Sequence, residues 1–328
     1  MESFRTEIKP DCVVDKIEYD SKIMFLGSCF ATNIGEKFKN ARLNCMVNPY
    51  GVIYNPMSVA NTLNAIVSNR IYYSEDLHFQ GEHWHSFYHH SSFSDRDKEI
   101  CLQKINENNL AAHDYLKSCQ YLFITFGTAW VYQWVENEEI VSNCHKYPAK
   151  DFNRYILNVE EIVSTYKKLL TELLVFNPKL KIVFTVSPVR HLKDGAHGNQ
   201  ISKATLLLAV DSIVEQFASC DYFPAYELLL DDLRDYRFYD VDMVHPNSTS
   251  VDYIWRKLES CFFSAKTLDY IKEMHKLVNA IGHRPYDSSS ESHQIFLNKQ
   301  IEKINYLKNK YPEVDFGSDL SYFKSKII

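Results

Sequence analysis

Short apolar runs that end at Gly or Pro alternate with helical stretches along the first 264 residues of this chain. Three of these runs, at residues 22–26, 121–126 and 181–186, have the length and composition of buried strands. A turn with the sequence GSC, GTAW or SPVR follows each run. Because strands that alternate with helices usually pair in parallel, the sequence predicts an α/β protein built on a parallel sheet.

The helices between these runs carry recognisable start signals. FATNIGEKFK follows the first strand directly and has helical spacing of its apolar residues. Asn55 can cap the next helix, MSVANTLNAIV, with Pro56 in its first turn.

After about residue 265 the pattern becomes purely helical. Apolar residues recur at helical spacing on both sides of the polar break PYDSSSES, at Leu268, Ile271, Leu277 or Val278, Ile281, Leu297, Ile301, Ile304 and Leu307. We therefore expect an α/β domain over residues 1–264 and a helical hairpin, packed on it, over residues 265–328.

Residues 72–98 interrupt the alternation with five histidines, many aromatic residues and no clear period. This composition predicts an inserted lid or loop region over the functional crevice. Four of its histidines, His83, His85, His89 and His90, lack a carboxylate spacing that would specify a metal site, so we expect no metal.

Composition and charge exclude several functions. The formal net charge is −6 and no long Lys/Arg run occurs, which argues against binding to duplex nucleic acid. No segment approaches the roughly 20 apolar residues of a membrane span, and the first residues do not resemble a signal peptide. Eight scattered cysteines without a CxxC pair favour reduced thiols and a cytoplasmic location over a disulfide framework or a zinc site.

Ligands of parallel α/β sheets bind outside the carboxyl ends of the strands. The turns Gly27-Ser28-Cys29, Gly127-Thr128 and the segment 187–190 should therefore converge on one crevice. This convergence is the first indication of where the functional site lies.

The sequence DMVHP, with Asp242 and His245, precedes a predicted helix near the end of the α/β region. A DxxH turn allows the carboxylate to orient the imidazole and to leave the other ring nitrogen free as a general base. The alternative is a histidine that merely caps or packs beside a helix start, and the motif alone favours that alternative.

Ser28 and Cys29 lie where the first strand gives way to the first helix. A hydroxyl or thiol there is exposed to the crevice, and a helix N-terminus favours an anionic nucleophile. The alternative is a plain N-cap, in which Ser28 only accepts a backbone N–H. The combination of this turn with a late DxxH makes catalysis the better interpretation.

The motif FLGSCFA at residues 25–31 resembles the signature of the GSCFA family, a bacterial group typical of Bacteroidota within the superfamily of SGNH (GDSL-like) hydrolases. The resemblance continues through NPYGVIYNP, FGTAWVY, NCHK, TVSPVRHLKDG and LRDYRFYDVDMVHP into the C-terminal helices. It implies a three-layer α/β/α, flavodoxin-like fold and the hydrolysis or transfer of ester-linked acyl groups.

The resemblance also assigns roles within the site. Cys29 occupies the place of the superfamily nucleophile and Ser28 that of the preceding Asp, although a shift of one residue restores Ser28 as the nucleophile. Asp242 and His245 match the last block. Gly51, in the segment Asn48-Pro49-Tyr50-Gly51, corresponds to the glycine whose N–H contributes to the oxyanion hole.

The third block, GxN, is incomplete in this chain. Gly127-Thr128-Ala129 lacks the Asn, so an oxyanion donor is missing or is replaced by the Thr128 hydroxyl or by Asn143. The loss of such a donor costs about 3 kcal/mol of transition-state stabilisation.

Two further groups have alternative interpretations. Arg190 and His191 could bind a carboxylate or phosphate of the substrate, or Arg190 could pair with an acidic residue of LLLDDLRDY. Cys144, beside His145, could be a second reactive thiol or a plain buried cysteine.

The sequence thus predicts an SGNH-type hydrolase that cleaves an acyl ester or thioester through a covalent acyl-enzyme. The base is His245, Asp242 orients it, and no cofactor is implied. The expected substrate is a small-molecule or cell-envelope-related acylated compound, not nucleic acid. The alternatives are an acyltransferase of the same fold and an SGNH-like binding or scaffold protein that has lost the chemistry.

Overall fold

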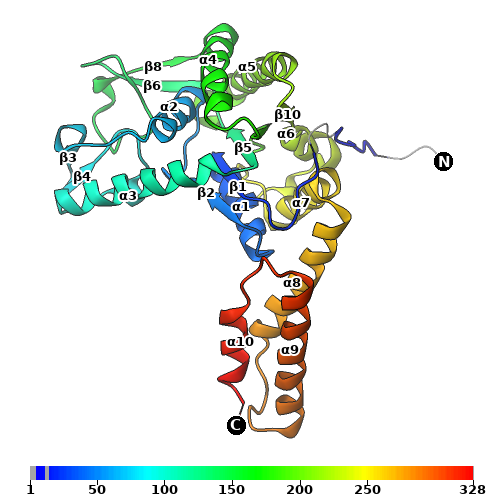
Figure 1. Ribbon diagram of the computed structural model, residues 1–328. Coiled ribbons are helices and arrows are strands. Elements are labelled where there is room, and N and C mark those ends of the chain that lie inside the picture. The colour runs from blue at the N-terminus through cyan, green and yellow to red at the C-terminus, as the bar shows by residue number, and fades with distance from the viewer. Residues whose placement is uncertain (1–4, 12–14, 328) are drawn as a thin grey trace.

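The structure is a computed structural model and describes residues 5–11 and 15–327. Its centre is a five-stranded sheet with the order β10-β9-β5-β1-β2, in which every neighbouring pair is parallel (Figure 1). The strands are β1 (Ile23–Gly27), β2 (Cys45–Val47), β5 (Tyr121–Phe126), β9 (Lys181–Val186) and β10 (Cys220–Tyr222). The three long strands confirm the predicted runs, whereas β2 and β10 were not predicted because three residues are too few to show a period.

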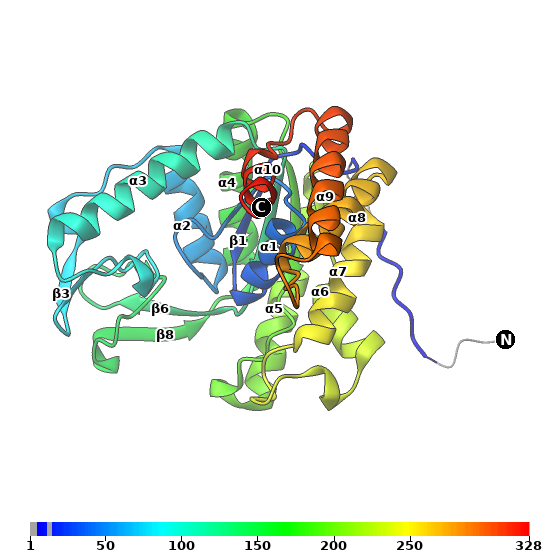
Figure 2. The same ribbon diagram turned by 90° about the horizontal axis from the view of Figure 1, so that it is seen from below.

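Side chains of the central strands alternate between two cores. Met24 and Leu26 of β1 belong to the core beneath α2 (Pro56–Val67), α3 (Lys98–Lys117), α4 (Val159–Phe176) and α5 (Gly195–Gln216). Ile23 and Phe25 belong to the core beneath α1 (Cys29–Asn40) and α7 (Ser248–Phe262). The expected three-layer α/β/α class is therefore confirmed, with the parallel sheet between two helical layers (Figure 2).

The predicted helix starts follow from local capping. Asn55 is the N-cap of α2 and its side chain accepts the N–H of Ser58, with Pro56 at the first helical position. Asn247 caps α7 in the same way through the N–H of Ser250. A short helix, α6 (Ala225–Glu227), follows β10 and continues into a π-helical turn at Leu228–Leu233.

Two antiparallel additions interrupt the α/β pattern. β6 (Trp130–Trp134), β7 (Ile140–Val141) and β8 (Phe152–Ile156) form a small sheet directly after β5. β3 (His78–Gln80) and β4 (His83–His85) form a hairpin within the predicted lid. In the predicted lid, the ring of His89 stacks on that of Tyr50 with a centroid distance of 4.1 Å. One residue of the predicted lid, His90, lines the site cavity described below. The lid role stays a prediction.

The C-terminal part consists of α8 (Ala265–Gly282), α9 (Glu291–Lys310) and α10 (Gly317–Lys324), which project together from the α/β part (Figure 1). The predicted hairpin is α8 and α9, and α10 is an addition that buries Phe323. Tyr270 of α8 donates a hydrogen bond to the carbonyl oxygen of Arg42, at 2.9 Å, and Arg42 pairs with Asp319 of α10. The boundary at residue 264 stays a prediction.

Within residues 5–11 and 15–327, no helix is both long and apolar enough to cross a membrane. The expectation that every thiol is reduced is wrong for Cys261, which is disulfide-bonded. Cys29, Cys45, Cys101, Cys119, Cys144 and Cys220 are free thiols.

Candidate active site

A cavity of about 520 Å³ lies at the carboxyl edge of the central sheet. Cys29 enters it from the start of α1, Thr128 from the end of β5, Arg190 and His191 from the loop after β9, and His245 from the loop before α7. The strands β1 and β5 are neighbours, and the chain leaves them toward opposite edges of the sheet. The cavity therefore lies at the topological switch point, where α/β proteins bind their ligands.

The turn that presents the nucleophile depends on Gly27. Its φ is +135°, and a Cβ atom at this position would lie 2.1 Å from the carbonyl oxygen of Thr125 in β5. Only glycine allows so close an approach of the two strands. The turn is held by hydrogen bonds from Gly27 N–H to Asn48 Oδ1, at 2.9 Å, and from Ser28 N–H to Thr125 O, at 3.1 Å.

Ser28 and Cys29 have different environments. Ser28 is fully buried at 0% exposure, and its Oγ accepts the N–H of Phe30 at 3.3 Å as the N-cap of α1. Cys29 is partly exposed and lines the cavity. The thiol therefore faces the cavity, whereas the hydroxyl is used as a helix cap.

Burial raises the pKa of the Cys29 thiol above its ordinary value. The backbone N–H groups of Phe30 and Cys29 and the ammonium group of Lys203 act in the opposite direction, and the carboxylate of Asp242 raises the pKa further. The expectation that a helix start lowers this pKa is therefore corrected, because desolvation outweighs the N-terminal N–H groups. A protonated thiol at neutral pH needs a general base.

The DxxH turn supplies a paired imidazole. Asp242 Oδ2 lies 2.6 Å from Nδ1 of His245, while Oδ1 accepts the N–H groups of Val244 and His245, each at 2.9 Å. These three hydrogen bonds, led by that from the His245 N–H, lower the pKa of Asp242 to about 2. An ionised carboxylate favours a proton on Nδ1 and leaves Nε2 of His245 as an acceptor.

The loop that carries His245 is fixed to the loop after β9. The N–H of Arg190 donates to the carbonyl oxygen of Val244 at 3.1 Å, and the N–H of Asp240 donates to the carbonyl oxygen of His245 at 2.7 Å. The Nε atom of Arg190 donates to the hydroxyl of Tyr239 at 3.3 Å. Arg190 makes no ion pair with the described residues, so its guanidinium remains available to a ligand.

The structure does not offer Gly51 as the expected oxyanion donor. Its N–H donates to Asn48 O at 2.7 Å in a tight turn, and a Cβ at Gly51 would lie 2.1 Å from His90 Cβ. Asn48 has a structural role, since its side chain bridges Gly27 N–H and Thr32 Oγ1. The neighbour of Gly51, Val52, lines the cavity instead.

The residues of the incomplete GxN block, Gly127 and Thr128, also make structural contacts. The N–H of Gly127 donates to Tyr54 O at 2.7 Å. Thr128 Oγ1 lies 3.0 Å from Ser202 Oγ and accepts the N–H of Trp130 at 3.1 Å. Thr128 lines the cavity, but its hydroxyl already has two partners.

Asn143 and Cys144 also line the cavity. Asn143 Oδ1 accepts the N–H of His145 at 3.0 Å. Nε2 of His145 lies 2.9 Å from the carbonyl oxygen of Ser86. Burial raises the pKa of Cys144 to about 11. Among the described residues no histidine is hydrogen-bonded to the thiol of Cys144.

Sequence reasoning missed Lys203, which lies in the buried face of α5 with 1% exposure. Its Nζ donates to the carbonyl oxygens of Gly127 and Ser187, both at 2.7 Å, at the carboxyl ends of β5 and β9. Burial lowers the pKa of Lys203 to about 7. The signal was a lysine within the apolar stripe of a helix, among Ser202, Leu206, Ala209, Val210 and Ile213.

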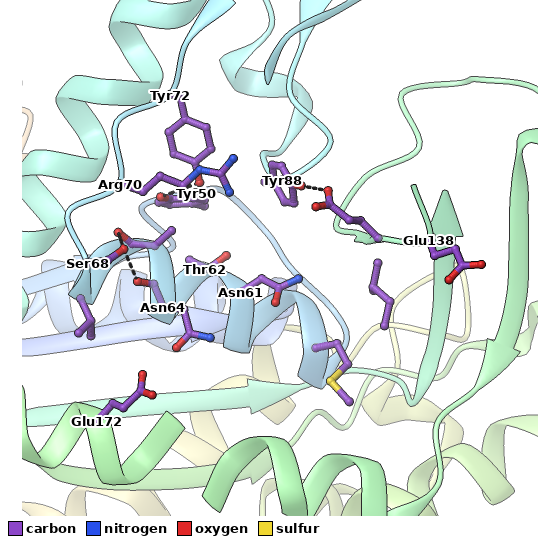
Figure 3. A pocket seen from close by; sticks show the side chains of 15 residues that line it. Tyr50, Asn61, Thr62, Asn64, Ser68, Arg70, Tyr72, Tyr88, Glu138 and Glu172 are labelled. Carbon is purple, nitrogen blue, oxygen red and sulfur yellow. Dashed lines mark hydrogen bonds between the residues drawn. The ribbon is translucent and has the colours of Figure 1, made fainter. Parts of the chain in front are cut away.

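A second cavity, of about 600 Å³, lies along α2 (Figure 3). Arg70 packs over the rings of Tyr72 and Tyr88 there, at 4.6 and 5.2 Å from the ring centroids, and binds Asp76 at 2.8 Å. Neither His nor Cys is among the described residues that line this cavity. It therefore offers neither a thiol nor an imidazole among the described residues.

Comparison with known proteins identifies the family of the chain. The GSCFA family model matches residues 22–258, which include the GSC turn and the DxxH motif. The chain belongs to the GSCFA family. A model for the C-terminal domain of GSCFA domain proteins matches residues 274–328. No curated protein matches this GSCFA protein.

Several solved structures are remotely similar to this GSCFA protein. A carbohydrate esterase family 3 from Talaromyces cellulolyticus is 12% identical, with 77% of this chain and 99% of that chain covered and a TM-score of 0.37. An acetyl xylan esterase from the rumen bacterium Butyrivibrio proteoclasticus is 11% identical, with 74% and 64% covered and a TM-score of 0.39. Because the similarity is remote, the activity is inferred below from the cavity alone.

Proposed function

We propose that this GSCFA protein is a hydrolase of acyl esters or thioesters that works through a covalent acyl-enzyme on Cys29. One observation carries the proposal: a partly exposed thiol and a carboxylate-paired histidine line the same cavity at the switch point of the sheet. Nucleophilic catalysis needs these components, namely a nucleophile, a base and a group that orients the base.

The proposed reaction follows from the protonation states of the site. Nε2 of His245 takes the thiol proton as Sγ of Cys29 forms a bond to the acyl carbon, and the π electrons of the carbonyl move to its oxygen. Collapse of this intermediate expels the alcohol oxygen, which receives the proton from His245. The acyl group is then a thioester on Cys29. Water, deprotonated by His245, attacks the thioester, releases the acid and restores the thiol.

The developing oxyanion needs hydrogen-bond donors. The N–H of Cys29 lies beside its thiol at the start of α1, and a helix N-terminus favours negative charge. We therefore assign one donor to the backbone of Cys29 rather than to Gly51. Placement in the SGNH superfamily is part of the proposal and is supported by the strand order and by the late DxxH.

The experiment is acylation by p-nitrophenyl acetate, followed by release of p-nitrophenol and by the mass of the acyl adduct. Wild-type protein should carry one acetyl group on Cys29, and Cys29→Ala should form no adduct. Cys144→Ala is the matched control, because Cys144 is a thiol of the same cavity that lies outside any helix start, and it should be acylated like the wild type.

Ser28→Ala decides between the adjacent candidates. This variant should keep most of the acylation, because Ser28 Oγ is buried and used as a helix cap. Loss of acylation in Ser28→Ala but not in Cys29→Ala would move the nucleophile to Ser28. If activated esters and thioesters never label the wild-type protein, the hydrolase proposal is wrong and a binding function takes its place.

A further inference from the structure

His191 is a second histidine of the candidate active site. It follows Arg190 in the loop after β9, and its ring lines the cavity together with Cys29 and His245. Its backbone N–H donates to Asn199 Oδ1 at 2.9 Å, and its ring packs edge-on against Tyr54 at a centroid distance of 5.9 Å. The loop and the ring are therefore both held in place without any bond to Nε2.

The Nε2 atom of His191 is buried and has no hydrogen-bond partner in the part of the chain that the structure describes. A buried polar atom without a partner costs free energy, so such atoms in folded proteins usually have a partner or a functional role. Here the atom belongs to a residue that lines a cavity, which makes a bound substrate the natural partner.

Its position relative to the nucleophile turn follows from Gly127. A methyl group placed on Gly127 would lie 3.3 Å from His191 Nε2 and 3.4 Å from Ser28 Cβ. His191 Nε2 therefore lies no more than about 6.7 Å from Ser28 Cβ, in the turn that carries Cys29. Gly127 is also the glycine of the incomplete GxN block, so His191 Nε2 lies beside the first residue of that block.

The charges around His191 favour the neutral ring. Burial, with smaller contributions from Lys203 and from the ring of His245, lowers its pKa to about 4, and Asp194 acts in the opposite direction. At neutral pH the imidazole is therefore uncharged and carries a single N–H, so it can donate a hydrogen bond without transferring a proton.

We propose that neutral His191 donates a hydrogen bond from Nε2 to the carbonyl oxygen of the acyl substrate and replaces the missing GxN amide. The proposal rests on the acyl-enzyme function assigned above. As Sγ of Cys29 attacks the acyl carbon and the π electrons move to oxygen, the Nε2–H bond to that oxygen strengthens. When the intermediate collapses, the electrons return to the carbonyl and the proton stays on Nε2.

The test compares two reactions of the same thiol. Acylation by p-nitrophenyl acetate forms an oxyanion, whereas alkylation by iodoacetamide is a displacement that forms none. His191→Phe keeps a ring but no donor, and His191→Gln places an amide N–H at a reach similar to Nε2. In His191→Phe, we expect acylation of Cys29 to be about 100-fold slower than in the wild type. Alkylation of Cys29 in the same variant should stay within about threefold of the wild-type rate. His191→Gln should recover most of the acylation rate.

Three outcomes would overturn the assignment. If His191→Phe is acylated as fast as the wild type, His191 has no role in the reaction. A parallel loss of acylation and alkylation would show that His191 acts on the thiol or on folding. If His191→Gln does not recover acylation, the reaction needs an imidazole at this position, and His191 acts as a base rather than as a hydrogen-bond donor. Absence of acylation in the wild type, in contrast, defeats the proposed function itself.

Discussion

The carboxylate of Asp242 holds His245 by its side chain and its backbone at once: Oδ2 lies 2.6 Å from Nδ1, and Oδ1 accepts the backbone N–H at 2.9 Å. The same carboxylate therefore shapes the turn and sets the tautomer of the ring. Met243, between them, has a positive φ of 57°, as the tight turn requires. The two roles of Asp242 can be separated by experiment.

Asp242→Asn should keep the turn but lose the His245 tautomer that carries its proton on Nδ1. The amide oxygen can still accept the N–H groups of Val244 and His245, but the amide nitrogen would donate to Nδ1 and force the proton onto Nε2. We expect acylation of Cys29 to fall about 100-fold or more, with the circular dichroism spectrum and the unfolding temperature close to those of the wild type. An unchanged acylation rate would remove His245 from the role of base.

Ser28→Ala tests the structural role of the hydroxyl. Loss of the cap on the Phe30 N–H should lower the free energy of unfolding by about 1 kcal/mol, measured by urea titration. Asn158→Ala is a matched control, because Asn158 caps α4 through the N–H of Glu161 far along the chain. Both variants should lose similar stability and keep the acylation of Cys29. No loss of stability in Ser28→Ala would contradict the cap.

Local patterns predicted the frame of the fold and the place of the site. The three long strands, the Asn55 cap and the helices α8 and α9 follow from spacing and capping within a few residues. The convergence of the turns at residues 27–29, 127–128 and 187–190 follows from parallel pairing, which brings carboxyl ends to one edge. These features depend on short stretches of sequence, and such stretches can be interpreted without the rest of the chain.

The features that the sequence did not predict depend on contacts between residues that are far apart in the chain. The antiparallel strands β6 to β8 pair across a long loop, and the alternation of their side chains is weak. The engagement of the Gly51 N–H by Asn48 and the burial of Lys203 against Gly127 and Ser187 also exist only in the folded chain. Desolvation of Cys29, which reverses the expected direction of its pKa, comes from the same packing.

Gly27→Ala should prevent normal folding. The added methyl would lie 2.1 Å from Thr125 O, and the φ of +135° is strained for any residue with a side chain. We expect little soluble protein, or a free energy of unfolding lower by more than about 3 kcal/mol, as large losses are typical of severe backbone conflict. Gly282→Ala is the control, since nothing lies within 4 Å of its added methyl and its φ is not positive. Near-normal stability of Gly27→Ala would contradict the described turn.

Lys203→Met should weaken the thiolate form of Cys29. The ammonium group of Lys203 lowers the pKa of Cys29, so its removal should move the pH profile of Cys29 alkylation to higher pH. At pH 6, below the Lys203 pKa of about 7, we expect a loss of rate of up to about tenfold, because one pKa unit changes the thiolate fraction tenfold. Lys168→Met, at an exposed position of α4, should leave the profile unchanged. An unshifted profile in Lys203→Met would show that the two groups do not interact.

Mild acid should destabilise the protein through two buried histidines. Burial lowers the pKa of His89 to about 3 and that of His145 to about 4, below their ordinary value of 6.5. Between pH 6.5 and about 4 the unfolded chain therefore binds protons that the folded protein does not, so stability falls as the pH falls through this range. From pH 7 to pH 5 the expected loss is about 2 kcal/mol for each histidine.

Urea titrations at pH 7 and pH 5 measure this loss. His89→Gln removes one titrating ring, so its free energy of unfolding should change less between the two pH values than that of the wild type, by about 2 kcal/mol. His275→Gln, at an exposed position of α8, should retain the wild-type difference. A pH dependence that is equal in the wild type and in His89→Gln would mean that His89 is protonated to the same degree in the folded and unfolded states, contrary to its burial with 1% exposure.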